Sequence, residues 1–378
     1  MQRITVSWLV YRLTNSMLLL GVVSFMGQLP VFLMTPFSGV LVDRYNNRHK
    51  VIIVMQCLAM TQAFIFAALV LTGTIRTYHI VMLSFILGVI NSIEMPARQS
   101  FIVELIDDRK TLSSAIALNS SMVNVARLVG PSLAGAIIAI WGEGLCFVFN
   151  GLSYLAVLIS LLQMKFKPKT HVKKHAHVLQ DLKEGVAYVY GNKPILFIIS
   201  MLAFTSLVST SYQTLLPVFA RDIFHGGSHT AGFMSGALGC GALIGAGYLG
   251  HRKKSISGLG NVIASASLLM SLSLIAYSIS HIFLFSIGLL ILIGLSSLLQ
   301  MASSNTLIQT LADDSKRGRV MSIFIMAWMG MTPFGALLAG VLARHVGAPH
   351  TLLISGSLCL IVSIIFLKEM PNINKAMS

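Results

Sequence analysis

The stretch GVLVDRYNNRHK, from Gly39 to Lys50, joins two long apolar segments of the sequence. It is short and basic, and it carries one acid, Asp43. Two hydrophobic helices that are joined by so tight a charged turn must lie side by side, with the turn at the surface of a membrane. The stretch therefore predicts a pair of antiparallel membrane helices, and the rest of the chain repeats the same pattern.

The composition of the whole chain is that of a polytopic membrane protein. Hydrophobic residues occupy 55% of the 378 positions, charged residues occupy 10%, and the mean hydropathy is +0.81. These values exclude an ordinary soluble fold. Runs of about 20 apolar residues recur along the chain, and each is long enough to cross about 30 Å of hydrocarbon as an α-helix. The four cysteines stand singly in apolar segments and are expected to be packing residues.

Hydropathy divides the chain into about eleven full spans and a shorter first segment. Met1 to Tyr11 would rise only about 16 Å as a helix, so the first span is expected to be truncated, either because the true start lies upstream or because half a helix has been lost. The expected fold is an all-α membrane protein with two six-helix halves, 1–164 and 194–378, and a cytoplasmic linker loop at 165–193. The full spans are expected at 17–42, 51–71, 80–98, 115–140, 145–164, 194–219, 230–249, 259–280, 282–305, 320–343 and 351–367.

The cations are distributed unevenly between the two sets of connections. One alternate set holds 21 of the 27 Lys and Arg residues, and the opposite set holds four. Loops rich in Lys and Arg stay in the cytoplasm, so the protein is expected in the inner membrane with its C-terminus inside. The cations form no basic face with interleaved aromatics, so nucleic acid is not an expected partner. The expected partners are a small-molecule substrate and membrane lipids, and the expected state is a monomer.

An internal repeat supports the division into two halves. The segment GVINSIEMPARQSFIVELIDDRK, which starts at Gly88, matches GLSSLLQMASSNTLIQTLADDSK, which starts at Gly294, at a constant offset of 206 positions. The same offset relates Gly39 to Gly245. Parallel repeats of this kind place a substrate cavity between the two halves, near the middle of the membrane.

The stretch from Gly39 resembles the signature loop of the major facilitator superfamily of secondary transporters. That loop has a glycine, an Asp-Arg pair and further basic residues between the second and third spans. The resemblance implies a latch on the cytoplasmic gate, with roles for Gly39, Asp43, Arg44 and Arg48. The second-half counterpart, residues 245–254, has basic residues but no acid.

Two further motifs narrow this resemblance. RLVGPSLAG, from Arg127 to Gly135, is similar to the Gly-Pro signature of exporters in the superfamily and implies gating positions at Gly130 and Pro131. WLVYRLTNS, from Trp8, and EMPARQSF, from Glu94, resemble the subgroup that includes enterobactin-type siderophore exporters and drug efflux proteins. The resemblance therefore implies efflux.

Glu94 is the one acid that the span boundaries place inside a span. A buried carboxylate costs several kcal/mol unless it is paired or hydrated, so it is a candidate for function. It would then carry a proton between the two sides of the membrane. Pairing with Arg98, four residues along the same helix face, or a gating contact with the signature loop are the structural alternatives.

Arg127 is expected near the middle of the fifth span. Ser120, Asn124, Arg127 and Pro131 recur at spacings of three and four residues, so one face of this helix is polar. A cation on a cavity wall would bind an anionic or catecholate-like group with bidentate geometry. The alternative is a fixed structural pair, for example with Glu94.

Gln28, Gln213 and Gln300 are further polar candidates within spans, for substrate contact or for hydrogen bonds between helices. Gln300 takes the place of Glu94 in the second repeat. No glycine-rich nucleotide loop precedes a Lys-Ser/Thr pair, so ATP is not expected as the energy source. We expect no enzymatic activity, no metal and no cofactor, and we expect a proton gradient to supply the energy.

Together these features predict a proton-coupled secondary transporter that exports an amphipathic, siderophore-like or drug-like molecule by alternating access. Two alternatives stay open at this point. The protein could be a flippase for lysophospholipid or other lipids, or a truncated membrane partner that transports nothing.

Overall fold

The computed structural model consists of helices and the turns that join them. It describes residues 1–44, 48–105, 109–164, 178–252, 258–314 and 316–375. Within these residues, ten helical segments are long and apolar enough to cross a membrane. One of them, 128–163, turns at Gly142, where the backbone has a φ of 81° and a ψ of 172°. Counted as two crossings, it brings the spans to the eleven that hydropathy predicts.

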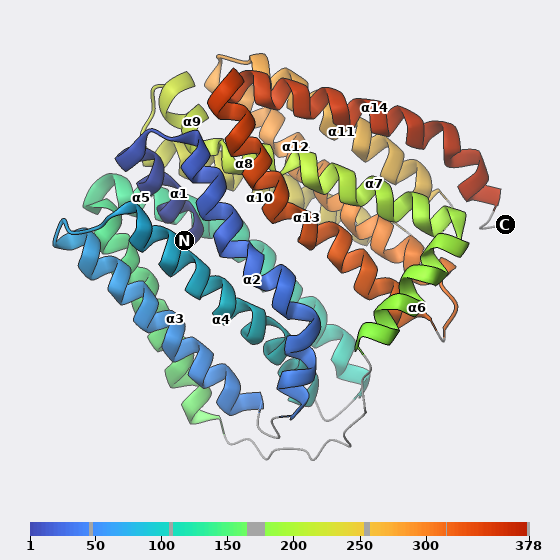
Figure 1. Ribbon diagram of the computed structural model, residues 1–378, viewed down its shortest axis with the longest axis horizontal. Helices are drawn as coiled ribbons and strands as arrows, with labels where there is room; N and C mark the ends of the chain where they lie inside the picture. Colours follow the sequence, from blue (N-terminus) through green and yellow to red (C-terminus); the bar gives the residue numbers. More distant parts are fainter. Residues whose placement is uncertain (45–47, 106–108, 165–177, 253–257, 315, 376–378) are drawn as a thin grey trace.

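Two helical bundles make up the molecule (Figure 1). The first contains α1 (Gln2–Thr14), α2 (Met17–Arg44), α3 (Arg48–Leu71), α4 (Thr77–Glu104) and α5 (Arg109–Gln163). The second contains α7 (Lys193–Ser209), α8 (Ser211–Thr214), α9 (Leu216–Val218), η1 (Phe219–Ile223), α10 (Ser228–His251), α11 (Leu259–Ile279), α12 (Phe283–Leu311), α13 (Arg317–Val346) and α14 (Ala348–Lys375).

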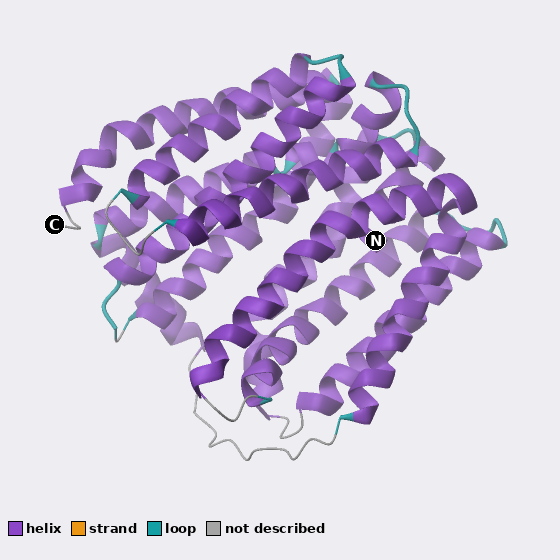
Figure 2. Cartoon of the chain, turned by 180° about the vertical axis from the view of Figure 1, so that it is seen from behind, coloured by secondary structure: helices purple, strands orange, loops and turns teal. Residues whose placement is uncertain are grey.

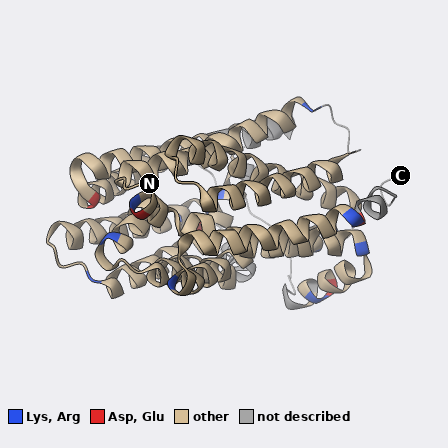
Figure 3. Ribbon diagram, turned by 90° about the horizontal axis from the view of Figure 1, so that it is seen from above, with Lys and Arg blue, Asp and Glu red and all other residues tan. Residues whose placement is uncertain are grey.

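The two bundles meet along two pairs of helices. α2 packs against α13, and α5 packs against α10. Within the bundles, α2 packs on α4 and α3 on α5, while α10 packs on α12 and α11 on α14. The view from behind shows the same arrangement of long, roughly aligned helices (Figure 2). Most of their length carries neither Lys or Arg nor Asp or Glu (Figure 3), as a hydrocarbon environment requires.

The molecule has two distinct ends. At the end that we call the cation-rich end, α2 stops and α3 begins, and α12 stops and α13 begins. At the opposite end, α1 joins α2, α3 joins α4, and α11 joins α12. This division separates the two sets of connections that differ in cation content, so the structure places the charge asymmetry of the sequence at opposite ends of one helical body.

Small residues bring the two bundles into close contact toward the opposite end. A Cβ atom added to Gly21 of α2 would lie 2.7 Å from the carbonyl oxygen of Ala336 and 3.0 Å from the Cα of Gly340, both on α13. A Cβ atom on Gly135 of α5 would lie 2.7 Å from the carbonyl oxygen of Ser228 on α10. The backbones therefore approach so closely that only glycine fits without a shift.

The span expected at 194–219 is not one continuous helix. α7 ends at Ser209 and is followed by the short helices α8 and α9 and by the π-helix η1. Pro217 lacks the N–H that a continuous helix would use, and the hydroxyls of Thr210 and Thr214 donate to the backbone carbonyls of Ser206 and Thr210 over 2.6 and 3.2 Å. Such bonds compete with regular helix geometry.

The segment expected as a linker loop at 165–193 is partly helical. Its second part forms α6 (Val178–Gly191), which packs against α13 and α7. Glu184 of α6 pairs with Lys316 and Arg319 over 3.4 and 2.6 Å. The cations of this segment drew attention to solvent exposure, whereas its apolar residues form a face that packs on the second bundle.

Candidate functional site

A cavity of about 1390 Å³ lies between the two bundles. Its lining comes from α1, α2 and α4 on the side of the first bundle, and mainly from α7, α8, α10, α12 and α13 on the side of the second. Gly318 and Arg319, in the first turn of α13, line it at the cation-rich end. Typical small-molecule sites occupy about 300–1,000 Å³, so this cavity has room for a large organic molecule.

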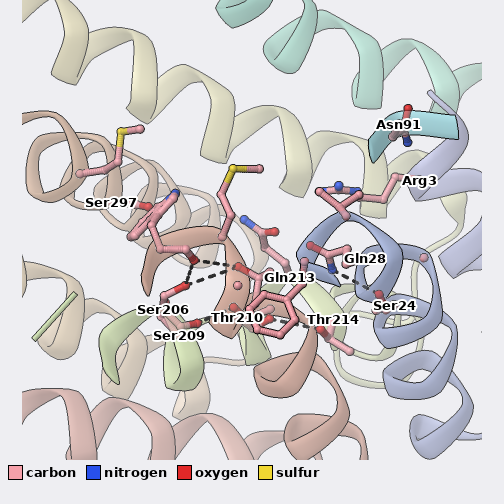
Figure 4. A pocket seen from close by; sticks show the side chains of 18 of the residues that line it. Arg3, Ser24, Gln28, Asn91, Ser206, Ser209, Thr210, Gln213, Thr214 and Ser297 are labelled. Carbon is pink, nitrogen blue, oxygen red and sulfur yellow. Dashed lines mark hydrogen bonds between the residues drawn. The ribbon is translucent and has the colours of Figure 1, made fainter. Parts of the chain in front are cut away.

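The wall formed by the first bundle is polar. Arg3 of α1 extends into the cavity, and Gln28 of α2 and Asn91 of α4 lie beside it (Figure 4). The side-chain nitrogen of Gln28 donates to the carbonyl oxygen of Ser24, one turn earlier, over 3.3 Å. A cation and two amides therefore face the cavity from three different helices.

Glu94 and Arg98 lie on the same wall, nearer the cation-rich end. The Glu94 carboxylate is almost fully buried, pairs with the Arg98 guanidinium, and accepts a hydrogen bond of 3.2 Å from the Gln56 side chain on α3. The side chain of Arg98 is 52% exposed, and both partners line the cavity. The pair predicted from the spacing of four residues is thus confirmed.

The wall formed by the second bundle carries hydroxyl groups where α7 is interrupted. Ser206, Ser209, Thr210 and Thr214 line the cavity together with Gln213 (Figure 4). The Ser206 hydroxyl donates to the backbone carbonyl of Trp328, and the Gln213 amide donates to the Tyr212 hydroxyl over 3.1 Å. An interrupted helix at membrane depth is tolerated where it faces a cavity, which is the position of this segment.

The rest of the second wall is apolar and adaptable. Met326, Trp328 and Met329 of α13 and Met301 of α12 all line the cavity. Methionine side chains are flexible and polarisable, and they adapt to ligands of different shape. The cavity therefore presents a polar wall with a cation on one side and an apolar, sulfur-rich and aromatic wall on the other.

Polar contacts join the two bundles at the opposite end. The Tyr11 hydroxyl of α1 donates to the carboxylate of Asp222 in η1, and the Arg221 guanidinium donates to the Asn15 side-chain oxygen over 2.6 Å. The Arg221 guanidinium carbon lies 5.8 Å from the centre of the Tyr11 ring. We call these four residues the outer cluster. Together with the glycine contacts they close the cavity at this end.

The sequence of nearly the whole chain matches one family. A family described as transmembrane secretion effector matches residues 1–377. The chain belongs to this family, within the major facilitator superfamily. The resemblance inferred from the signature loop is therefore confirmed, and so is the expected fold.

Curated relatives of this transmembrane secretion effector are transporters. The staphyloferrin A transporter of Staphylococcus aureus is 26% identical, over 96% of this chain and 90% of the relative. Macrolide efflux protein A of Streptococcus pyogenes is 22% identical, over 93% of this chain and 87% of the relative. A solved bacterial homologue of the lysosomal transporter Spinster has the same fold, with a TM-score of 0.70 and 12% identity over 99% of this chain and 94% of that chain.

The protein is therefore an efflux-type transporter of the major facilitator superfamily and a multi-pass protein of the bacterial cytoplasmic membrane. The family and these relatives are transporters and not enzymes, as the sequence predicts. A cavity between two helical halves is the feature of this fold that a transporter requires, because substrate sites of such repeats lie at the interface between the halves.

The structure brings several of the predicted site residues together. Gln28, Glu94, Arg98, Pro131 and Gln213 all line the cavity. Two others lie elsewhere. Gln300 is fully buried and donates to the Thr205 hydroxyl over 3.3 Å, and Gly130 faces the start of α1.

The remaining predicted residues fall largely outside the described part of the chain. The backbones of Ser120, Asn124 and Arg127 lie in α5, and those of Gly39, Asp43 and Arg44 lie in α2, but their side chains are outside the described residues. Arg48 begins α3. The roles of these residues in substrate contact and gating stay predictions.

Arg3 and the hydroxyl cluster on α7 and α8 were not among the predicted site residues. Arg3 satisfies the rule that applies to Glu94, because it is an ionisable residue inside an apolar helix. The shortness of α1 concealed it. The hydroxyls had no comparable signal, since serine and threonine recur in many of the spans.

Proposed function

We propose that this protein exports an amphipathic small molecule from the cytoplasm in exchange for protons, by alternating access between its two helical bundles. The observation that carries the proposal is the cavity between the bundles, which reaches the cation-rich end while glycine contacts and the outer cluster close the opposite end. The excess of Lys and Arg supports a cytoplasmic position for the cation-rich end, and with it for the C-terminus.

The lining supports an amphipathic substrate. One wall offers Arg3 and amide groups, and the other offers Trp328 and methionines. The relatives named for a siderophore and for macrolides also support a siderophore-like or drug-like substrate.

Glu94 is the residue that we assign to proton coupling. It is the one acid among the described residues of the lining, and it is held by Arg98 and Gln56. A carboxylate with a cationic partner can exchange that partner for a proton when the bundles move, which links proton release to the change of state. No cofactor has a part in this scheme, and one chain contains both bundles, so a monomer suffices.

Inverted membrane vesicles test the proposal. Vesicles that contain the protein are given an acidic interior, and uptake of staphyloferrin A and of the macrolide erythromycin is measured with and without an uncoupler. We expect uptake of at least one compound that requires both the protein and the pH gradient. Movement of a fluorescent lysophospholipid in place of both compounds would contradict the proposal and favour a lipid flippase.

A further inference from the structure

The charges that line the cavity are unequal. Among the described lining residues there are three cations, Arg3, Arg98 and Arg319, and one acid, Glu94. Arg98 pairs with Glu94, and Arg319 pairs with Glu184 of α6 over 2.6 Å. These two cations lie toward the cation-rich end and each faces a carboxylate. Arg3 is the cation on the deeper part of the wall.

The position of Arg3 along α1 places it near the middle of the membrane. Eleven residues separate it from Thr14, which ends α1 at the opposite end, and a helical rise of about 1.5 Å per residue puts it roughly 16 Å from that end. The hydrocarbon layer is about 30 Å thick. A cation at this depth is costly unless it is hydrated or meets a negative group, and the cavity gives access to both.

Hydrogen-bond donors surround Arg3. Figure 4 shows Gln28 and Asn91 beside it and Gln213 on the facing wall. A side-chain amide carries two N–H donors, and Gln28 and Gln213 each use one on a neighbour. The guanidinium fork and the second amide hydrogens together match the oxygen atoms of a carboxylate or a similar acid.

We propose that Arg3 is the anion-binding group of the cavity and that the substrate is an amphipathic acid. Its acid group lies against α1, α2 and α4, and its apolar part lies against Trp328 and the methionines of α13. This inference rests on the proposed export function and specifies the substrate class. A cationic substrate would face Arg3 and find as its counter-charge a carboxylate that already pairs with Arg98.

A matched pair of fluorescent probes tests the inference by binding alone. Dansylglycine and dansylamide share a fluorophore, and dansylglycine also carries a carboxylate. Binding of each is measured with the purified full chain in lipid nanodiscs. We expect the wild type to prefer dansylglycine, and Arg3→Gln to weaken dansylglycine binding by about ten- to hundredfold, because a hydrogen bond to a charged group is lost. Dansylamide binding should change little.

Two further variants separate charge from folding. Arg3→Lys keeps the charge and loses the fork, so it should retain part of the preference. Arg344→Gln, at an exposed cation in the last turn of α13, should retain all of it. Thermal unfolding of each variant checks that the helical body is intact.

Equal binding of the two probes by the wild type, or an unchanged preference in Arg3→Gln, would overturn the assignment of Arg3. Either result leaves the export proposal standing, because gradient-driven uptake in vesicles tests export independently. Failure of that uptake would contradict export, and binding in nanodiscs would still report on Arg3.

Discussion

Glu94 shows how a single side chain combines structural and functional demands. Its carboxylate pairs with Arg98 on the same helix and accepts from Gln56 on α3, so it ties α4 to α3 while it faces the cavity. Its repeat counterpart, Gln300, is buried against Thr205 and does not line the cavity. The two halves share a backbone pattern, but the ionisable group at this level is in the first half.

Replacing Glu94 by Gln tests its assignment to proton coupling. We expect gradient-driven uptake in inverted vesicles to fall to the level of vesicles without the protein, while exchange of substrate across the membrane without a gradient continues. The neutral amide preserves an oxygen acceptor for Gln56 but cannot release a proton. The control is Asp314→Asn, because the Asp314 side chain is 90% exposed and pairs with Arg317 at the cation-rich end. Unchanged gradient-driven uptake in Glu94→Gln would remove the residue from the coupling mechanism.

The helices α2 and α13 depend on glycine for their contact near the opposite end. The Cβ that Gly21→Ala would add meets backbone atoms of Ala336 and Gly340 at 2.7 and 3.0 Å. Overpacking of this kind costs about 1–3 kcal/mol, whereas Ala gains up to about 1 kcal/mol over Gly in helix propensity.

We therefore expect Gly21→Ala to lower the melting temperature of the purified protein by several degrees. Gly247→Ala on α10 is the matched control, since a Cβ there meets no atom within 4 Å. It should leave the melting temperature unchanged or raise it. A Gly21→Ala protein that melts with or above this control would show that the contact is looser than described.

The short π-helix η1 presents Arg221 and Asp222 to the end of α1, and the outer cluster joins the two bundles there. Tyr11→Phe removes the hydroxyl that donates to Asp222 and preserves the ring beside Arg221. Loss of a hydrogen bond to a charged group costs about 1.5–3 kcal/mol, so the opposite end should open more often.

Labelling of a cysteine at Ser24, which lines the cavity, measures this opening. In cells, with the native cysteines replaced, we expect a membrane-impermeant maleimide to label Ser24→Cys about tenfold faster when Tyr11→Phe is present. Tyr78→Phe, at an exposed tyrosine of α4, serves as the control. Equal labelling rates in the two variants would show that the outer cluster does not hold this end closed.

Much of the molecule follows from hydropathy and charge. The expected starts at Met17 and Leu259 and the expected end at Leu71 coincide with helix boundaries, because runs of apolar residues end where the chain must meet water. The interruption of α7 was missed since Pro217 lies within an apolar run. The contact of the Glu94–Arg98 pair with the cavity required the packing of α4 against α2, which spacing along one helix cannot supply.

The whole molecule has one closed end and one cavity that reaches the other, and the contacts that close it occur in two equivalent pairs of helices, α2 with α13 and α5 with α10. Because α10 and α13 correspond to α2 and α5 in the repeat, both pairs can separate in one motion. Alternating access requires that closure at the cation-rich end accompanies this separation.

Distances between spin labels test this most directly. With the native cysteines replaced, labels at the exposed positions Leu105 and Gly318 report on the cation-rich end, and labels at Thr74 and His281 report on the opposite end. Adding the compound that vesicles accumulate should populate a shorter distance in the first pair and a longer distance in the second. Distances that stay constant, or that change in the same direction at both ends, would contradict transport by alternating access.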